Sequence, residues 1–437
     1  MLRALSRPAT RMMERWLPDA FIFVIVLTLI AAIAAVATQS TNPVTLIRIW
    51  GDGFWELLQF SMQMLLVLVT GFILASSPPV RRVLQWIAGF AGSRGSAIVL
   101  VSVVSLAASW LNWGFGLVVG AIFAKELARQ VRVDYRLLVA AAYSGFVIWH
   151  GGLSGSIPLT IATPGHFTEN QIGVIPTSQT IFSAWNLTIA VAILITVPLV
   201  NRAMLPTEEE QVLVDPAQLG EDAGPASAER RATPAERLET SPILMWLIGL
   251  PGLVWLAIYF LGGGGINLNT VNFLFLFLGI LCHGTPRNLL AALDQGVRGG
   301  AGIVIQFPFY AGIMAIMTGS GLAASMSEWF VSISTAESLP FWAFISAGIV
   351  NIFVPSGGGQ WAVQAPVMLP AAEALGADIP RVVMGVAWGD AWTNLLQPFW
   401  ALPMLGIAGL KPRDIMGFCV VQLLITGLVI GGLLYLL

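Results

Sequence analysis

The chain has 437 residues, of which 57% are hydrophobic and 10% charged, with a formal net charge of −2 at pH 7. Soluble domains carry about 25% charged residues, so this composition excludes an ordinary soluble protein and indicates an integral membrane protein. The small net charge gives no basis for a nucleic-acid partner. The two cysteines and three histidines show no metal-ligand spacing, so we expect neither a metal site nor another cofactor.

Long apolar runs predict membrane helices rather than a barrel. Ala20–Ala37, Ile181–Val200, Met245–Leu261 and Ile415–Leu437 approach or exceed the length of about 20 residues that crosses a bilayer. Met1–Pro18 lacks an apolar core, so we expect no cleavable signal peptide. The predicted fold class is an all-α polytopic membrane protein.

The first half begins with a basic end. Arginines at positions 3, 7, 11 and 15 precede a span near Asp19–Thr38, which places this end in the cytoplasm by the positive-inside rule. Asn42–Leu58 returns along the outer face, and a second span at about Gln59–Ser77 ends beside further arginines. Ser96–Ala128 has basic residues at both ends, so we predict a re-entrant hairpin from the cytoplasm. The alternative is a true span with a compensating error elsewhere.

An interrupted span completes the first half. Asp134–Thr163 is too long for one plain helix, and His150–Ser156 breaks it, so we predict a discontinuous helix with an unwound middle. Pro164–Gln179 has no Lys or Arg and is predicted to be external. Ile181–Val200 then returns to the cytoplasm.

An acidic segment divides the chain. Leu205–Thr240 holds nine acids and four prolines, and we predict a flexible cytoplasmic linker. It separates a first membrane repeat, residues 1–204, from residues 241–437. The latter are predicted to hold a connecting helix and a second, inverted repeat.

The second half is predicted to repeat the same order upside down. Its predicted parts are a crossing at Pro242–Leu261, a crossing at Asn269–Cys282, an inner-face segment at Thr285–Gly300, a crossing near Ala301–Thr318, a hairpin at Leu339–Leu375, an interrupted span at Pro380–Leu410 and a last crossing at Asp414–Leu437. The whole chain would then have about nine crossings plus two hairpins, with the C-terminus outside. This topology leaves 19 of the 21 Lys and Arg residues inside, and only Arg48 and Arg381 outside.

The tip of the second hairpin is the most unusual stretch of the chain. Asn351–Pro366 interrupts an apolar segment with prolines, a serine, three glycines and two glutamines. Its apolar flanks, Leu339–Val350 and Val367–Leu375, are each too short to span a bilayer. The alternative is a surface loop between two spans, but short arms around a glycine-rich tip favour a re-entrant hairpin.

The two halves correspond at a nearly constant spacing. Asn112 and Asn351 are 239 residues apart, Asp134 and Asp378 are 244 apart, and Tyr143 and Trp388 are 245 apart. Inverted repeats with paired broken helices are typical of secondary transporters, whose site lies at the repeat interface near the membrane midplane. We therefore predict that the two tips lie close together there.

The candidate substrate- or ion-binding residues lie at the two tips and the two breaks. They are Asn112, Trp113, Gly114, Gly116, His150, Ser154, Ser156, Asn351, Ser356, Gly357, Gly358, Gly359, Gln360, Asp390, Asn394 and Gln397. Helix starts at such positions favour anions, so a small carboxylate could bind at Ser356–Gly359 without an arginine. The alternative is that each tip asparagine only holds its hairpin together.

Two titratable residues could couple transport to an ion. Asp390 is an acid well inside a predicted span, where acids are costly and usually functional, so it is a candidate for a coupling proton or cation. His150 could titrate near neutrality. Each also has a structural alternative, Asp390 bonded to Trp392 or Asn394 and His150 as a satisfied buried side chain. The sequence does not choose between H+ and Na+.

Four motifs, in order, resemble the bacterial short-chain fatty acid transporters. They are Trp50–Trp55, Asn112–Gly120, Val354–Gly359 and Gln397–Pro403, within a likeness that runs from Trp16 to the C-terminus. The resemblance implies transport of a small carboxylate such as acetate, butyrate or acetoacetate across the bacterial inner membrane. It also implies membership of a superfamily whose members carry paired hairpins and are often homodimers.

Other classes of membrane protein fit the sequence less well. A membrane enzyme would need a Ser/His/acid set or a metal-ligand cluster, and neither is evident. An ATP-driven pump is excluded because the linker has no P-loop. A channel or exchanger for small carboxylates on the same fold stays open beside the ion-coupled symporter.

Overall fold

The computed structural model describes residues 20–215, 219, 233–352, 354 and 356–437, and no strand occurs among them. Several predicted features lie outside these residues: the N-terminal arginines and the expected absence of a signal peptide, linker positions 216–218 and 220–232, and tip residues Phe353 and Pro355.

The first half contains the predicted hairpin and broken helix. Its elements are α2 (Ala20–Gln39), α3 (Pro43–Gly53), α4 (Leu58–Ala75), α5 (Pro78–Ala88), α6 (Arg94–Leu111), α7 (Trp113–Gln130), α8 (Tyr135–Ser144), η1 (Gly145–Gly151), α9 (Ser156–Ile161), α10 (Glu169–Ile172), η2 (Thr177–Gln179), α11 (Ala184–Ala203) and η3 (Glu208–Glu210). The break between α8 and α9 confirms the interruption predicted at His150–Ser156.

The second half repeats this order. Its elements are α12 (Pro234–Glu239), α13 (Pro242–Leu261), α14 (Leu268–His283), α15 (Pro286–Gly319), α16 (Leu322–Ile333), α17 (Leu339–Val350), α18 (Gly357–Leu375), α19 (Ile379–Thr393), η5 (Asn394–Leu396), α20 (Pro398–Ala408) and α21 (Pro412–Leu436). The break at η5 confirms the second predicted interruption.

Two predicted boundaries are wrong. The second hairpin arm was expected at Val367–Leu375, but α18 already begins at Gly357 because the Ser356 hydroxyl accepts a bond from the Gly359 N–H and starts the helix. The segments Thr285–Gly300 and Ala301–Thr318 were expected to be separate, but α15 runs through both. Its internal glycines face neighbouring side chains, as at Gly300 and Leu65, and do not end the helix.

Within the described part of the chain, seven helical segments are long and apolar enough to cross a membrane. They are Leu58–Ala75, Arg94–Leu111, Tyr135–Ile161, Ala184–Ala203, Pro242–Leu261, Pro286–Gly319 and Pro412–Leu436. Helix α6 is among these seven, although it is an arm of the predicted first hairpin, so helix length alone does not distinguish a membrane crossing from a hairpin arm. The count of nine crossings and two hairpins therefore stays a prediction.

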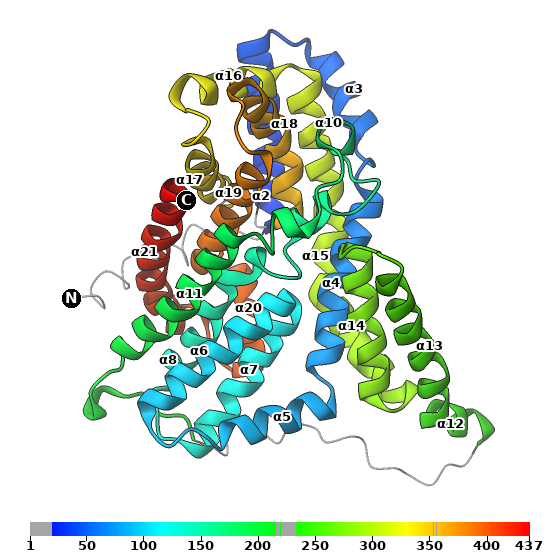
Figure 1. Ribbon diagram of the computed structural model, residues 1–437, viewed down its shortest axis with the longest axis vertical. Helices are drawn as coiled ribbons and strands as arrows, with labels where there is room; N and C mark the ends of the chain where they lie inside the picture. The colour runs from blue at the N-terminus through cyan, green and yellow to red at the C-terminus, as the bar shows by residue number, and fades with distance from the viewer. Residues whose placement is uncertain (1–19, 216–218, 220–232, 353, 355) are drawn as a thin grey trace.

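Paired residues of the two halves play matching roles. Asp134 caps α8 by accepting a bond from the Leu137 N–H, and Asp378 caps α19 by accepting one from the Arg381 N–H. Helix α2 of the first half packs on α15 of the second, and α14, which follows the predicted connecting helix α13, packs on α4 of the first. In Figure 1 the hairpin α6–α7 lies at the bottom and α17–α18 near the top, with α19 and α20 between them.

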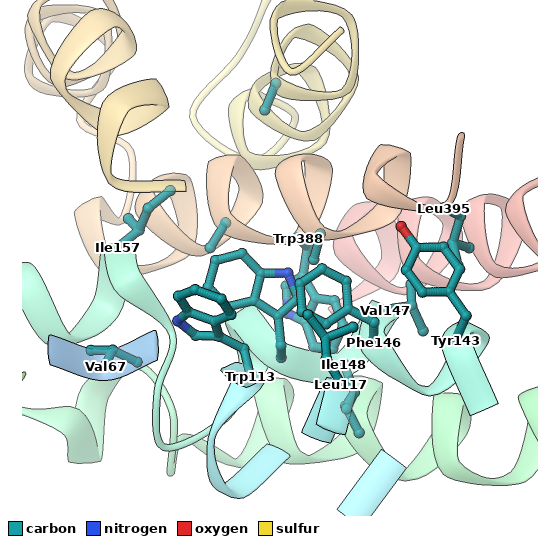
Figure 2. Packing of buried hydrophobic residues seen from close by; sticks show 14 of the residues in the cluster. Val67, Trp113, Leu117, Tyr143, Phe146, Val147, Ile148, Ile157, Trp388 and Leu395 are labelled. Atoms are coloured by element: carbon teal, nitrogen blue, oxygen red, sulfur yellow. The ribbon is translucent and has the colours of Figure 1, made fainter. Parts of the chain in front are cut away.

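The interface between the halves is buried. Helix α19 packs on η1, α20 on α7, and α21 on α8 and α11. Figure 2 shows part of it, where Trp113 and Phe146 of the first half share one buried cluster with Trp388 and Leu395 of the second.

A polar network ties α21 to the first half. The Asn201 side-chain amide donates to Ser102 Oγ at 2.9 Å and to Ser144 Oγ at 2.8 Å, and its oxygen accepts from Gln422 at 2.8 Å. All four side chains are buried. One asparagine therefore links α6, α8, α11 and α21.

We expect Asn201→Leu to lower the stability by about 1–3 kcal/mol, because Gln422 and two serines lose a buried partner. The measurement is the unfolding midpoint of the purified protein in detergent. Thr188→Ala on the same helix is the control, since the Thr188 hydroxyl bonds only its own turn at an exposed position. Equal midpoints for the two variants would contradict the role of the network.

Candidate functional site

The two breaks contact one another. The Trp149 indole N–H of η1 donates to Asn394 Oδ1 at 3.0 Å, and the Tyr143 hydroxyl donates to the Asn394 carbonyl at 2.7 Å. In return the Trp388 indole N–H donates to Asn186 Oδ1 at 2.9 Å. Groups at the second break are thus satisfied by side chains of the first half, whereas the Gly151 carbonyl of the first break accepts a bond from Asn186 of its own half.

His150 and Asp390 lie together at this interface. His150 Nδ1 is 2.7 Å from the Ala387 carbonyl oxygen and 3.4 Å from Asp390 Oδ1, and neither side chain is exposed to solvent. Both carboxyl oxygens of Asp390 and Nε2 of His150 are buried without a hydrogen-bond partner. Because burying an ionisable group without partners is costly, these atoms stand out from the other buried polar groups of the interface as unused hydrogen-bonding capacity.

The glycine run lies directly against this pair. A Cβ at Gly357 would overlap the His150 ring, one at Gly358 would lie 2.6 Å from the Phe60 ring, and one at Gly359 would overlap the Tyr310 ring. The three glycines therefore admit three aromatic rings to the first turn of α18. That turn has N–H groups without acceptors in the helix, and its dipole favours an anion.

Amide side chains hold the second tip in place. The Asn351 amide donates to the Asp390 carbonyl at 2.8 Å and to Thr393 Oγ1 at 2.9 Å, and the Gln397 amide donates to the Asn351 carbonyl. Gln360 donates to the Ala347 carbonyl at 2.9 Å. Asn351 Oδ1 and Gln360 Oε1 are buried without a donor, so two acceptors remain for a ligand or cation.

The first tip differs, because its polar groups are used within the first half. Asn112 Oδ1 accepts from the Phe115 N–H, and the Asn112 amide donates to the Val67 carbonyl. Gly114 and Gly116 allow close packing, on Leu68 and Ser109 respectively.

Two serines of the first break are likewise used locally. The Trp113 N–H donates to Ser154 Oγ at 2.8 Å, and Ser156 is the first residue of α9. The Trp113 ring contacts the Trp149 and Trp400 rings, at centroid distances of 6.0 and 5.3 Å. The path Trp113–Trp149–Asn394–Gln397–Asn351 thus connects the two tips, and both tip asparagines are buried.

Sequence reasoning missed three aromatic members of the site. Trp149 stacks on His150 with ring centroids 3.5 Å apart, and its place beside His150 could have indicated this role. Tyr310 and Phe60 come from α15 and α4, which read as plain apolar spans. The Tyr310 hydroxyl is buried without a partner. Only the tertiary structure brings these two rings to the glycine run.

The chemistry of the site suits binding better than catalysis. His150 Nε2 bonds no hydroxyl, so Ser356, His150 and Asp390 do not form a nucleophile–base pair. No group of three His, Cys, Asp or Glu residues that could hold a metal ion occurs in the described ranges. No residue named at the site is Lys or Arg, so an anion would depend on helix N–H groups and on a bound proton or cation.

Comparisons with known proteins agree with a transporter fold and identify the family. The chain matches the model of the short chain fatty acid transporter family over residues 1–437. It is 46% identical over 432 residues to a protein of Escherichia coli (strain K12), with 98% of each chain covered. It is 43% identical over 436 residues to one of Haemophilus influenzae, again with 98% of each covered. The names of both assign them to the short-chain fatty acid transporters.

Among solved structures, the chain is similar to the YdaH transporter of Alcanivorax borkumensis, with a TM-score of 0.60 and 16% identity. The match covers 96% of this chain and 97% of that one, and YdaH is described as having an unusual topology. At this identity the likeness concerns the fold. On the full-length family match and its two relatives, the chain belongs to the short-chain fatty acid transporter family and is a multi-pass membrane transporter rather than an enzyme.

Proposed function

We propose that this chain carries short-chain fatty acids of the acetate, butyrate and acetoacetate class across the bacterial inner membrane, coupled to H+ or Na+, by alternating access. The observation that carries the proposal is the buried Asp390–His150 pair against the start of α18, at the interface between the halves. The family and the named relatives support the substrate class.

The substrate carboxylate would bind at Ser356–Gly359, on the first-turn N–H groups of α18. This helix start offers no full positive charge, and an anion alone in a buried site is costly. A proton or Na+ at Asp390 and His150 offsets that cost, so anion and cation bind together. Because the anion and the cation bind together, the loaded carrier has the same net charge as the empty one, whereas binding of the anion alone would add a buried charge; the empty and the fully loaded carrier can therefore reorient, which gives symport.

The remaining candidates support this core in the proposal. Asn351, Gln360, Asn394 and Gln397 position the tip, and the free side-chain oxygens of Asn351 and Gln360 offer acceptors to a cation. Trp361 follows Gln360 in α18 and is buried, and its indole nitrogen has no hydrogen-bond partner. We propose cytoplasmic placement of the N-terminus and linker, and a homodimeric assembly from the family resemblance.

If Asp390 carries the coupling proton, Asp390→Asn should abolish butyrate accumulation driven by a pH gradient but leave counterflow exchange largely intact. Exchange needs only the loaded carrier to reorient, whereas accumulation needs a group that binds the coupling proton on one side of the membrane and releases it on the other. Labelled butyrate uptake into proteoliposomes, with H+ and Na+ gradients imposed separately, is the measurement. If Na+ is the coupling ion, the variant should instead lose sodium-dependent binding.

Asp294→Asn is the matched control, because Asp294 pairs with Arg298 on an exposed face of α15. Normal accumulation by Asp390→Asn would make Asp390 structural and leave His150 as the next candidate. Flux that equilibrates butyrate but never follows either gradient would instead establish a channel or exchanger.

Gly357→Ala should reduce uptake by about tenfold or more, because its Cβ would displace the His150 ring from the start of α18. Gly432→Ala is the control, since a Cβ there meets nothing within 4 Å. Both are scored by initial rates of butyrate uptake at equal membrane expression. Wild-type uptake by Gly357→Ala would remove this contact from the transport site.

The topology is tested with reporter fusions. A reporter at the N-terminus or within the linker should be active in the cytoplasm, and one after Leu437 should be active in the periplasm. The reason is the charge distribution, with Arg48 and Arg381 alone outside. Both termini on one side would break the inverted-repeat arrangement.

A further inference from the structure

A cavity of about 160 Å³ adjoins the proposed transport site at Phe60. Its lining includes Gln59, Phe60, Gln63, Thr160, Thr163 and His166, from α4, α9 and the loop after α9. Gln59 at the rim is exposed, whereas Phe60, Thr160 and Thr163 on the inner wall are buried. The cavity therefore reaches from the surface to the inner wall formed by Phe60.

Phe60 separates this cavity from the glycine run. The residue lines the cavity, and the outer end of its ring meets Gly358 so closely that a Cβ there would lie 2.6 Å from the ring. The ring also contacts Phe167 of the loop at 5.6 Å and Phe307 of α15 at 5.7 Å, measured between ring centroids. Phe307 in turn contacts Tyr310, which covers Gly359. A continuous row of rings thus closes the start of α18 from this side.

The cavity wall combines polar and apolar side chains and has no cation. Burial lowers the pKa of His166, so this side chain is neutral at neutral pH, and both of its ring nitrogens are engaged, with Thr168 Oγ1 and the Gly173 carbonyl. Glu56 is the acid of the lining. The Thr160 and Thr163 hydroxyls donate to carbonyls of their own turn, and the Gln63 amide donates to Asn269. The wall therefore offers a carboxylate few donors and no positive charge and does not hold it tightly, which suits a passage.

We propose that this cavity is the outer vestibule through which a small carboxylate enters, and that Phe60 is the gate between it and the start of α18. This inference rests on the proposed function for the identity of the solute and for the outward orientation. Because Phe60 fills the space beside Gly358, its side chain also limits the length of the acid that passes. Movement of the ring opens the passage, and the contacts with Phe167 and Phe307 close it.

The gate is tested by thiol labelling from outside. Met64 lies one turn after Phe60 and also faces Gly358, so Met64→Cys is a reporter behind the gate, and Gln59→Cys is a control at the rim. Each cysteine is introduced into full-length protein that also carries Cys282→Ala and Cys419→Ala. Right-side-out vesicles that contain the protein are then treated with a small, membrane-impermeant methanethiosulfonate reagent that carries a sulfonate group. No fatty acid or ion gradient is present.

Phe60→Ala should raise the labelling rate of the Met64→Cys reporter about tenfold or more, and leave that of the rim control unchanged. Phe60→Leu is the conservative variant if Phe60→Ala does not reach the membrane. An unchanged rate behind the gate overturns the proposal. This readout needs no substrate, so it is independent of the uptake assay. If the labelling rate rises as expected but the protein transports no fatty acid, the gate is supported and only the proposed function is contradicted.

Chain-length selectivity is the second readout. Phe60→Ala should raise hexanoate uptake relative to butyrate, whereas Phe273→Ala should not, because Phe273 contacts Trp255 and Phe277 away from the cavity. A hexanoate-to-butyrate ratio that equals the wild-type ratio would remove the role of Phe60 in selecting acid length.

Discussion

The structure depends on one constraint, that backbone and polar groups freed inside a membrane must find partners in the protein or in its ligand. Each half unwinds in one helix, and hydrogen bonds between the halves join the elements around both breaks. Tyr143 and Trp149 bond Asn394 from the first half, and Trp388 bonds Asn186 from the second. The second break is thus held directly across the interface, and the first through Asn186, which also bonds the Gly151 carbonyl.

The same constraint shows where the site differs from its surroundings. At the first tip the hydrogen-bonding capacity of Asn112 is used by its own half. At the second tip Asp390, His150, Asn351 and Gln360 keep buried atoms without partners. The two halves therefore correspond in their order of elements but differ in how far their tip residues are satisfied, and the larger group of unpartnered atoms lies on the side of α18.

Glycine packing explains how the site closes. Residues Gly357–Gly359 have no side chains, so the rings of His150, Phe60 and Tyr310 reach the helix start from three different elements. An anion there would lie among aromatic walls and helix N–H groups, with no basic side chain in contact. In the proposed function, selectivity for small acids and dependence on a coupling cation have the same physical origin, a small buried site without a basic side chain.

The sequence by itself determined the membrane class, both breaks, both tips and the correspondence of the halves, because these follow from local hydrophobicity, glycine and proline placement and repeated spacing. It also identified Asp390 and His150 singly. Only the tertiary structure decided that they lie 3.4 Å apart and that Tyr310 and Phe60 cover the glycines. Such contacts join residues far apart in the chain, on helices whose one-dimensional patterns are plainly apolar, and rotation of each helix about its axis is fixed by packing alone. For the same reason the helical start at Gly357 was missed, since a glycine run predicts a loop until the rings around it are known.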